Sequence, residues 1–289
     1  MAGNYAEMDG KIWMDGKLVE WSEANVHLLT HAMHYASAVF EGERAYGGTI
    51  FESRRHSERL HFSARELDFE IPWTVDEIEA AKYETMKANG LSDAYVRALA
   101  FRGAGEDMGV SSARNPVRLA IATWAWGDYY GDAKMRGAKL DIAKWKRPSP
   151  ETAPSHAKAA GLYMICTMSK HAAEAKGCSD ALMFDYRGYV AEATGANVFF
   201  VKDGEVHTPT PDCFLNGITR QTVIGMLEDR QIKVHERHIM PEELEGFEQC
   251  WLTGTAAEVT PVGKIGDYSF EVGALAKDMS QSYEKLVRA

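Results

Sequence analysis

Alternating apolar and polar positions mark the strands in the first half of the chain. The runs "AYVRALAF" (94–101) and "VRLAIATWAW" (117–126) are rich in branched and aromatic residues, which favour extended backbone. Residues 11–23, "KIWMDGKLVEWSE", form two shorter runs on either side of Asp15-Gly16, a dipeptide typical of tight hairpins. We therefore expect a mostly antiparallel sheet in this part of the chain.

Between these strands the apolar spacing changes to that of helices. Residues 74–90, "TVDEIEAAKYETMKANG", have helical periodicity, with Thr74 in the N-cap position and Gly90 where the helix should end. Another helix is predicted to end near Leu67. The strands and helices together predict an α+β N-terminal domain over residues 1–126.

The second half of the chain predicts a separate domain. The segment "GDYYGDAKMRG" (127–137) is rich in Gly and Asp and lacks periodicity, so we interpret it as an interdomain loop. Residues 138–289 predict a strand, a helix over 159–176, hairpins such as the one that turns at Asp203-Gly204, and a closing helix. The strands do not alternate regularly with helices, and no G-x-G-x-x-G follows a strand. This favours a barrel-like or mixed sheet over a doubly wound one.

Composition narrows the class of protein. The chain has 289 residues, of which 45% are hydrophobic and 26% charged, as in a globular protein large enough for two domains. Its net charge of −10 disfavours nucleic acid as a partner. No apolar run approaches the roughly 18 residues of a membrane span. The four cysteines are far apart and lack metal-binding spacing, so we expect reduced thiols, no metal and a cytoplasmic location. The N-terminus lacks a basic start followed by an apolar block, so we expect no secretion signal.

One lysine lies in an unusual run of small residues. Lys158 stands in "PSHAKAAGLYM", just before a predicted helix. A lysine attacks a carbonyl only after it has lost its proton, which a sheltered position near other cations favours. The small neighbours would also let a flat ligand approach the backbone. On this segment alone a solvated lysine is the more common case, and we assign that role to Lys170 and Lys176.

Two further segments could bind an anion. In "CFLNGITRQTVIGML", Gly217, Ile218 and Thr219 stand at the expected start of a helix, where outward-pointing amides suit a phosphate. The alternative is that Thr219 is an ordinary N-cap. In "WLTGTAAEVTPVG" a strand breaks into small residues, and Thr255 offers a hydroxyl and an amide. A simple turn is the alternative there.

Charged side chains in strands and helices complete the candidate chemistry. Glu192 lies in an otherwise apolar strand, where a carboxylate needs a partner such as a protonated ring nitrogen. Tyr95 and Arg97 share one face of a strand and suit a carboxylate ligand. Arg59 could contact a phosphate. The plainer alternatives are a carboxylate in water, a structural ion pair and a solvated helix arginine.

Seven segments, in this order, resemble one family. They are "HAMHYASAVFEGERAY", "HSERL", "AYVR", "PSHAKAAGLYM", "EATGANVFFV", "LNGITRQ" and "LTGTAAEVTPV". The pattern resembles the branched-chain amino acid aminotransferases, class IV enzymes of the pyridoxal 5'-phosphate (PLP) fold type IV, over roughly residues 10–265. The resemblance implies an α+β fold of two domains. The first is a sandwich-like α/β domain, and the second, over 138–289, is a pseudo-barrel domain that carries the PLP lysine.

The resemblance implies a cofactor role for each matching residue. Lys158 would bind PLP covalently and carry a proton between substrate and cofactor. Glu192 would pair with the pyridine nitrogen, and Tyr163 would hydrogen-bond the ring hydroxyl. The other implied cofactor contacts are Arg59, Asn197, Gly217, Ile218, Thr219 and Thr255.

The resemblance also implies the substrate contacts. Tyr95 and Arg97 would bind the distal carboxylate of glutamate. The side-chain pocket would be lined by Tyr35, Phe40, Trp126 and Tyr129. The remaining implied contacts are Gly195, Thr255, Ala256 and Ala257. The loop 101–112, "FRGAGEDMGVSS", is longer and more acidic than in the family pattern.

The activity implied is a ping-pong transamination between branched-chain L-amino acids (Leu, Ile, Val) and 2-oxoglutarate, in a homodimer or a trimer of dimers. Other fold-type-IV activities are the nearest alternatives: a D-amino acid or (R)-amine transaminase, or an aminodeoxychorismate lyase. A non-catalytic PLP-binding protein is the alternative from a different class. The Tyr-x-Arg strand and the aromatic region around Tyr35 favour the branched-chain interpretation.

Overall fold

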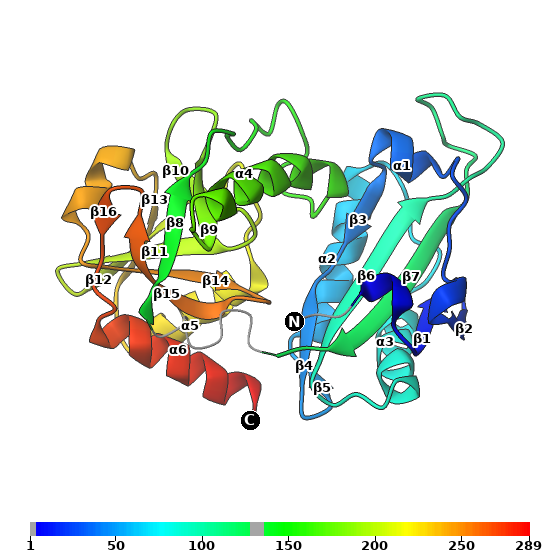
Figure 1. The fold of residues 1–289 in the computed structure, drawn as a ribbon, viewed down its shortest axis with the longest axis horizontal. Coiled ribbons are helices and arrows are strands. Elements are labelled where there is room, and N and C mark those ends of the chain that lie inside the picture. Colours follow the sequence, from blue (N-terminus) through cyan, green and yellow to red (C-terminus); the bar gives the residue numbers. More distant parts are fainter. Residues whose placement is uncertain (1–3, 128–135) are drawn as a thin grey trace. The chain divides into compact units, whose positions relative to one another are not determined.

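The computed structural model describes residues 4–127 and 136–289. Contacts divide the chain into two compact units (Figure 1). The first comprises Met1–Trp126 and Ala157–Gly161, and the second comprises Gly127–His156 and Leu162–Ala289. Most of the predicted interdomain loop lies outside the described residues.

A short piece of chain from the second half packs with the first unit. Val39 forms a β-bridge with Ala159, and the amide of Phe40 donates to the carbonyl of Lys158 at 3.2 Å. The predicted PLP lysine was expected in the C-terminal domain. These main-chain bonds instead group it with the N-terminal unit.

The first unit is built on a seven-stranded sheet in which every described pairing is antiparallel. The strand order is β2-β1-β7-β6-β4-β5, and β3 also pairs with β6. The predicted turn at Asp15-Gly16 is confirmed, since both residues have positive φ and join β1 to β2. The strands are β1 (Lys11–Met14), β2 (Lys17–Glu20), β3 (Ala38–Phe40), β4 (Glu43–Tyr46), β5 (Thr49–Ile50), β6 (Ala94–Arg102) and β7 (Val117–Ala125).

Two helices, α2 (Ser53–Glu66) and α3 (Val75–Ala88), cover one face of this sheet (Figure 1). Their apolar side chains form a buried core with the inward residues of the strands, among them Leu60, Ile78 and Ile121. Full burial of each such side chain contributes roughly 2 kcal/mol. Residues of β6 alternate, so Arg97 and its neighbours two residues away project from the opposite face. The short helix α1 (His31–Tyr35) precedes β3.

The second unit is built on a nine-stranded sheet that closes on itself. Its order is β10-β9-β8-β15-β14-β11-β12-β13, with β16 on β15. Because β10 also pairs with β11, the strands β8, β15, β14, β11, β10 and β9 form a closed ring, as a barrel-like sheet requires. The strands are β8 (Ala138–Ile142), β9 (Asp180–Phe184), β10 (Val190–Ala193), β11 (Asn197–Lys202), β12 (Glu205–Pro209), β13 (Val234–Arg237), β14 (Gln249–Gly254), β15 (Glu258–Ile265) and β16 (Tyr268–Ser269).

The helices of the second unit differ from the predicted ones at two starting points. The helix expected from residue 159 begins at Tyr163, after a 3-10 turn. Thr219 is not an N-cap, because Gly217 occupies that position and Thr219 lies inside the first turn. The helices are α4 (Tyr163–Ala175), α5 (Ile218–Glu228) and α6 (Ala274–Val287). The described 3-10 helices of the chain are Tyr5–Glu7, Trp21–Glu23, Ala160–Leu162 and Pro241–Gly246.

Among the described residues, no helix combines the length and the apolar character needed to cross a membrane.

Candidate functional site

Lys158 is held by its main chain to two elements of the first unit. Its amide donates to the hydroxyl of Ser63 on α2 at 3.0 Å, and its carbonyl accepts from the amide of Phe40. Its ammonium nitrogen lies 5.0 Å from the centre of the Phe40 ring. The side chain is half-buried between two buried alanines. The main chain of Lys158 is therefore fixed, and its side chain is only partly solvated.

Arg97 and Tyr95 extend this cluster along the open face of β6. The Arg97 guanidinium lies 4.7 Å from the centre of the Phe40 ring and donates to the Tyr95 hydroxyl at 3.2 Å. Tyr95 in turn packs on Trp126 with ring centres 4.7 Å apart. The structure therefore brings together five of the predicted site residues in the first unit: Phe40, Tyr95, Arg97, Trp126 and Lys158.

Arg59 is fixed by a carboxylate that the sequence did not single out. Glu41 accepts from Nε and Nη2 of Arg59, both at 2.7 Å. The same carboxylate lies 2.7 Å from Nδ1 of His56. Burial alone would raise the pKa of Glu41, but Arg59 and His56 hold that pKa well below its usual range. An acid within the apolar segment before β4 was the available signal, but its partners could not be read from the spacing.

Tyr35 contacts the loop that follows β6. Its hydroxyl donates to the Met108 carbonyl at 3.0 Å, and its ring stacks on His31 with centres 4.6 Å apart. Nε2 of His31 lies 3.1 Å from the Gly109 carbonyl, so both residues of α1 hold this loop. Tyr129, which like Tyr35 was predicted to line the side-chain pocket, lies outside the described residues.

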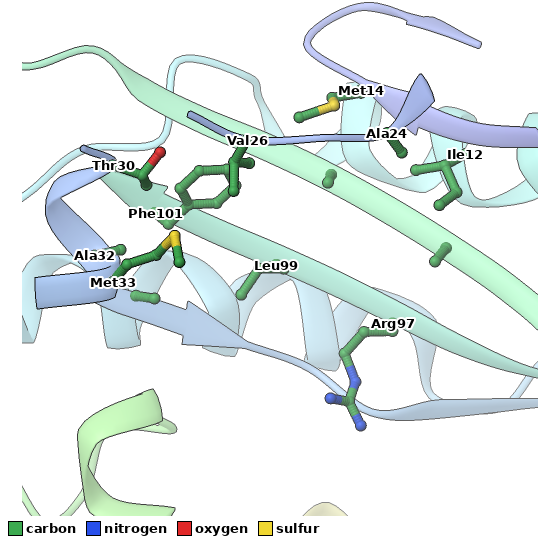
Figure 2. Close-up of a pocket in the computed structure, with 13 residues that line it drawn as sticks. Ile12, Met14, Ala24, Val26, Thr30, Ala32, Met33, Arg97, Leu99 and Phe101 are labelled. Atoms are coloured by element: carbon green, nitrogen blue, oxygen red, sulfur yellow. The ribbon is translucent and has the colours of Figure 1, made fainter. Parts of the chain in front are cut away.

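An apolar cavity of about 390 Å³ lies on the open face of the same sheet (Figure 2). Met14, Met33 and Phe101 are among its lining side chains, and Arg97 lies at its margin. Of the predicted site residues that the structure describes, only Arg97 lines it. Arg97 therefore borders both this cavity and the aromatic cluster.

In the second unit, Asn197 connects the predicted ring-binding carboxylate to the predicted phosphate loop. Its side-chain nitrogen donates to Glu192 at 3.1 Å, and its side-chain oxygen accepts from the Gly217 amide at 3.2 Å. A Cβ on Gly217 would lie 2.3 Å from that oxygen, so only glycine fits there. The Gly217 amide is thus used within the chain. The first-turn amides of Ile218 and Thr219, which no helix can satisfy internally, are the donors left for an anion.

Glu192 also has a buried cation beside it that the sequence did not indicate. Nε of Arg147 lies 3.4 Å from the Glu192 carboxylate, and Nη1 donates to the Cys166 sulfur at 3.4 Å. Burial lowers the pKa of Arg147, but the Glu192 charge, together with Cys166 and Tyr163, outweighs burial, so the pKa lies above its usual value. Burial also raises the pKa of Cys166 to about 11, so that thiol is protonated. Arg147 precedes a proline in a loop, and no spacing rule marks it.

Four of the remaining predicted residues of the second unit lie at the end of the ring where Asn197 begins β11, namely Gly195, Thr255, Ala256 and Ala257. Asn197 pairs with Thr253 in the register of β11 and β14, so the turn after β14 lies near it. A Cβ on Gly254 would lie 3.3 Å from the Gly195 carbonyl, which places Gly195 beside that turn. Thr255 and Ala256 are half-buried in the turn, and Ala257 is buried. Tyr163 is the first residue of α4.

Three side chains of metal-ligand type lie together in the second unit, but an arginine already pairs with their two carboxylates. Ligand atoms of Asp185, Asp212 and Cys213 lie within 4.8 Å of one another. Arg187 donates to both carboxylates, at 2.6 and 2.8 Å. Burial, aided by the two carboxylates, raises the pKa of Cys213 to about 12. An arginine and a protonated thiol favour a structural role for this cluster.

The donors fit a phosphorylated pyridine aldehyde. The first unit offers an anchored lysine and an arginine, and the second offers the carboxylate of the buried residue Glu192 and a helix start. These are the groups needed for an aldehyde, a phosphate and a ring nitrogen.

Comparison with known proteins gives the same family throughout. The family description "Amino-transferase class IV" matches residues 38–265. A probable branched-chain-amino-acid aminotransferase of Rickettsia felis is 38% identical, over 96% of this chain and 96% of its own length. The branched-chain-amino-acid aminotransferase of Pseudomonas aeruginosa is 37% identical, over 98% and 94%.

A solved structure extends the match to the fold. The T.th. branched-chain amino acid aminotransferase, complexed with N-(5'-phosphopyridoxyl)-L-glutamate, superposes with a TM-score of 0.92 at 36% identity, covering 97% of this chain and 95% of that one. The predicted α+β fold of PLP fold type IV is thereby confirmed. The chain is an aminotransferase and belongs to the class IV family, among the branched-chain amino acid aminotransferases.

Proposed function

We propose that this chain is a PLP-dependent transaminase that moves amino groups between branched-chain L-amino acids and 2-oxoglutarate by a ping-pong mechanism. The observation that carries the proposal is the cluster of Lys158, Phe40, Arg97 and Tyr95. It combines a nucleophile, an apolar aromatic surface and a carboxylate-binding edge. The solved phosphopyridoxyl complex supports it, because its ligand joins a phosphopyridoxyl group to glutamate.

We assign the cofactor contacts by chemistry. Bound PLP would supply an electron sink for the substrate Cα. Lys158 would hold the aldehyde carbon and afterwards move the proton at Cα. Glu192, oriented by Asn197, would keep the ring nitrogen protonated. Tyr163 would bond the ring hydroxyl. Arg59, the amides of Ile218 and Thr219, and Thr255 would hold the phosphate.

The substrate contacts follow from the same cluster. The Phe40 ring and Trp126 offer an apolar surface for a leucine or valine side chain. Arg97, with the Tyr95 hydroxyl beside it, offers a charged edge for the distal carboxylate of glutamate. One surface can therefore accept an apolar side chain in one half-reaction and a charged one in the other. The backbone around Thr255 to Ala257, next to Gly195, would receive the α-carboxylate.

We further propose a cytoplasmic homo-oligomer, a dimer or a trimer of dimers. All four cysteines are free thiols, as a reducing compartment maintains them. The loop after β6, held by α1, carries the exposed side chain of Val110, and α1 itself carries the exposed side chain of Met33. Exposed apolar groups of this kind are typical of surfaces that another chain covers.

A substrate panel tests the activity. The purified protein should transfer the amino group of L-leucine to 2-oxoglutarate, and its absorbance at about 410 nm, in the region of a bound pyridoxyl chromophore, should change on adding the amino donor alone. D-Alanine and (R)-1-phenylethylamine serve as competing donors. Turnover of only these two would overturn the branched-chain assignment and favour another fold-type-IV activity. A spectral change without turnover of any pair would favour a non-catalytic PLP protein.

A further inference from the structure

We propose that Glu41 is a positioning residue that sets where Arg59 meets the cofactor phosphate, and so fixes the spacing between the phosphate-binding arginine and Lys158. This inference rests on the proposed role of Arg59. Glu41 itself touches neither substrate nor cofactor in this assignment. It acts only through the arginine that it holds.

Glu41 binds Arg59 in a bidentate contact. Both carboxylate oxygens accept from Arg59, one from Nε and one from Nη2, each at 2.7 Å. Two parallel hydrogen bonds fix the plane of a guanidinium as well as its position. Glu41 has no exposed surface, while the Arg59 side chain is 15% exposed. The carboxylate therefore holds the arginine from inside the unit.

The position of Glu41 is itself fixed from two sides. Its amide donates to the Ala98 carbonyl of β6 at 2.8 Å, so its main chain belongs to the sheet. Its carboxylate oxygen Oε2 lies 2.7 Å from Nδ1 of His56. Because an ionised carboxylate only accepts, Nδ1 of His56 carries the proton in this bond. His56 thus sets the rotation of the carboxylate.

One helix links this assembly to the lysine. His56, Arg59 and Ser63 of α2 follow one another at spacings of three and four residues, which places them on one face of the helix. His56 and Arg59 bind Glu41, and Ser63 accepts from the Lys158 amide. The Lys158 carbonyl accepts from Phe40, the residue before Glu41. The positions of Arg59 and Lys158 therefore both depend on α2 and on the backbone of residues 40 and 41.

A neighbouring acid shows what a purely structural carboxylate looks like. Glu43 has no exposed surface either, but it binds Lys82 of α3 at 2.7 Å, and Lys82 also donates to Ser57. None of the contacts described for Glu43 involves Arg59. Glu43 thus offers a matched control, an equally buried acid two residues away that does not hold the arginine.

The direction of the change in phosphate affinity distinguishes a positioning role of Glu41 from a purely electrostatic one. Replacing Glu41 by glutamine removes a negative charge next to Arg59, which by Coulomb's law alone would strengthen phosphate binding. Loss of the bidentate contact would instead let the guanidinium rotate and weaken phosphate binding. We expect phosphate binding to weaken.

The test compares cofactors with and without phosphate. The full chain is stripped of cofactor and titrated with PLP and with pyridoxal, and the Kd for pyridoxal divided by the Kd for PLP measures the phosphate contribution. We expect Glu41→Gln to lower this ratio roughly tenfold, as loss of an orienting outer contact commonly does. Glu43→Gln should leave the ratio unchanged, even if its melting temperature falls. Arg59→Met should lower the ratio at least as much as Glu41→Gln.

Each outcome separates the positioning role of Glu41 from the phosphate role of Arg59. An unchanged or larger ratio in Glu41→Gln, with a lowered ratio in Arg59→Met, would overturn the positioning role alone. An unchanged ratio in Arg59→Met would overturn the phosphate role of Arg59 and the inference with it. If Glu41→Gln does not fold, His56→Gln replaces it, because rotation of the carboxylate should lower the ratio in the same direction. A ratio equal to that of the wild type in His56→Gln would then count against the proposal.

Discussion

Gly42 lies where the hydroxyl of Tyr95 comes closest to the main chain between β3 and β4. A Cβ at this position would be 2.1 Å from that hydroxyl, which is far inside contact distance. Tyr95 cannot move without disturbing Arg97, whose guanidinium donates to the same oxygen. The absence of a side chain at Gly42 therefore shapes the proposed carboxylate-binding edge of the cluster.

Gly42→Ala should displace the Tyr95 hydroxyl and raise the KM for 2-oxoglutarate by roughly tenfold or more, with a smaller effect on the KM for L-leucine, since displacements near 1 Å can cost about a hundredfold. Steady-state kinetics with each substrate varied would show this. Gly225→Ala is the matched control, because a Cβ there meets open space. Equal changes in both KM values would contradict the assigned role of Tyr95 and Arg97.

Lys158→Arg tests the nucleophile while keeping a cation at the Phe40 ring. Main-chain bonds to Ser63 and Phe40 do not depend on the side chain, so the variant should fold. A guanidinium stays protonated and cannot form a covalent bond with an aldehyde. Transamination should fall by on the order of a thousandfold or more, as for loss of a catalytic nucleophile. Activity close to the wild-type level would exclude Lys158 as the catalytic lysine.

Glu41 should make the protein sensitive to acid. Its folded pKa is lower than the usual value of 4.5, because Arg59 and His56 together outweigh its burial. An acid with a depressed pKa stabilises the folded state above its unfolded pKa, and that stability is lost as the pH falls toward the folded pKa. As the pH falls from about 5 to about 3, the free energy of unfolding should therefore fall more steeply for the wild type than for Glu41→Gln. Urea titrations at several pH values would measure both slopes, and parallel slopes would contradict the assignment.

At the scale of the elements, the N-terminus of α3 is capped. Thr74 accepts from the Glu77 amide, and the Glu77 carboxylate accepts from the Thr74 amide, which makes a capping box. Thr74→Ala should lower the free energy of unfolding by about 1 kcal/mol. The Kd for PLP should not change, because the contacts described for Thr74 lie within this helix start. Chemical denaturation and a cofactor titration would test both statements, and Asp76→Asn offers a first-turn control that leaves the box intact.

The same element shows what the sequence could predict. Thr74, Glu77 and Gly90 are local signals, and the helix they predicted is present at Val75–Ala88. The hairpin turns were equally local, since Asp203 and Gly204 both have the positive φ that their sequence favours. At α5 the local rule was wrong. Gly217 is the N-cap there because Asn197, twenty residues earlier, binds its amide and leaves no room for a Cβ.

The sequence offered candidate residues for the site but not their partners. Local sequence made Lys158 and Arg97 candidates, only the family resemblance gave them roles, and the structure groups them around Phe40. Glu41 and Arg147 were missed because their importance depends on contacts across 18 and 45 residues of chain. A buried ion pair leaves no periodic trace in the sequence, whereas a helix or a hairpin does.

At the scale of the whole molecule, the cofactor should stabilise both units if residues of both hold it. A ligand that binds only the folded state adds stability by mass action, about 2.7 kcal/mol at a concentration one hundred times its Kd. Increasing concentrations of PLP should therefore raise the melting temperature of every transition observed by differential scanning calorimetry. A transition that stays fixed while another moves would show that one unit contributes no cofactor contact.

The five residues Ala157–Gly161 have a consequence for how the protein is made. A ribosome that has released the first 126 residues has produced all of the first unit except this piece, which forms the bridge to Val39 and accepts the Phe40 amide. The unit is finished only when a later stretch of nascent chain returns to it with Lys158. A fragment ending at Trp126 should therefore be less stable than the unit within the intact chain, and it lacks Lys158, the proposed nucleophile. Synthesis order thus brings this lysine to the first unit after the arginine and the aromatic residues of that unit have been made.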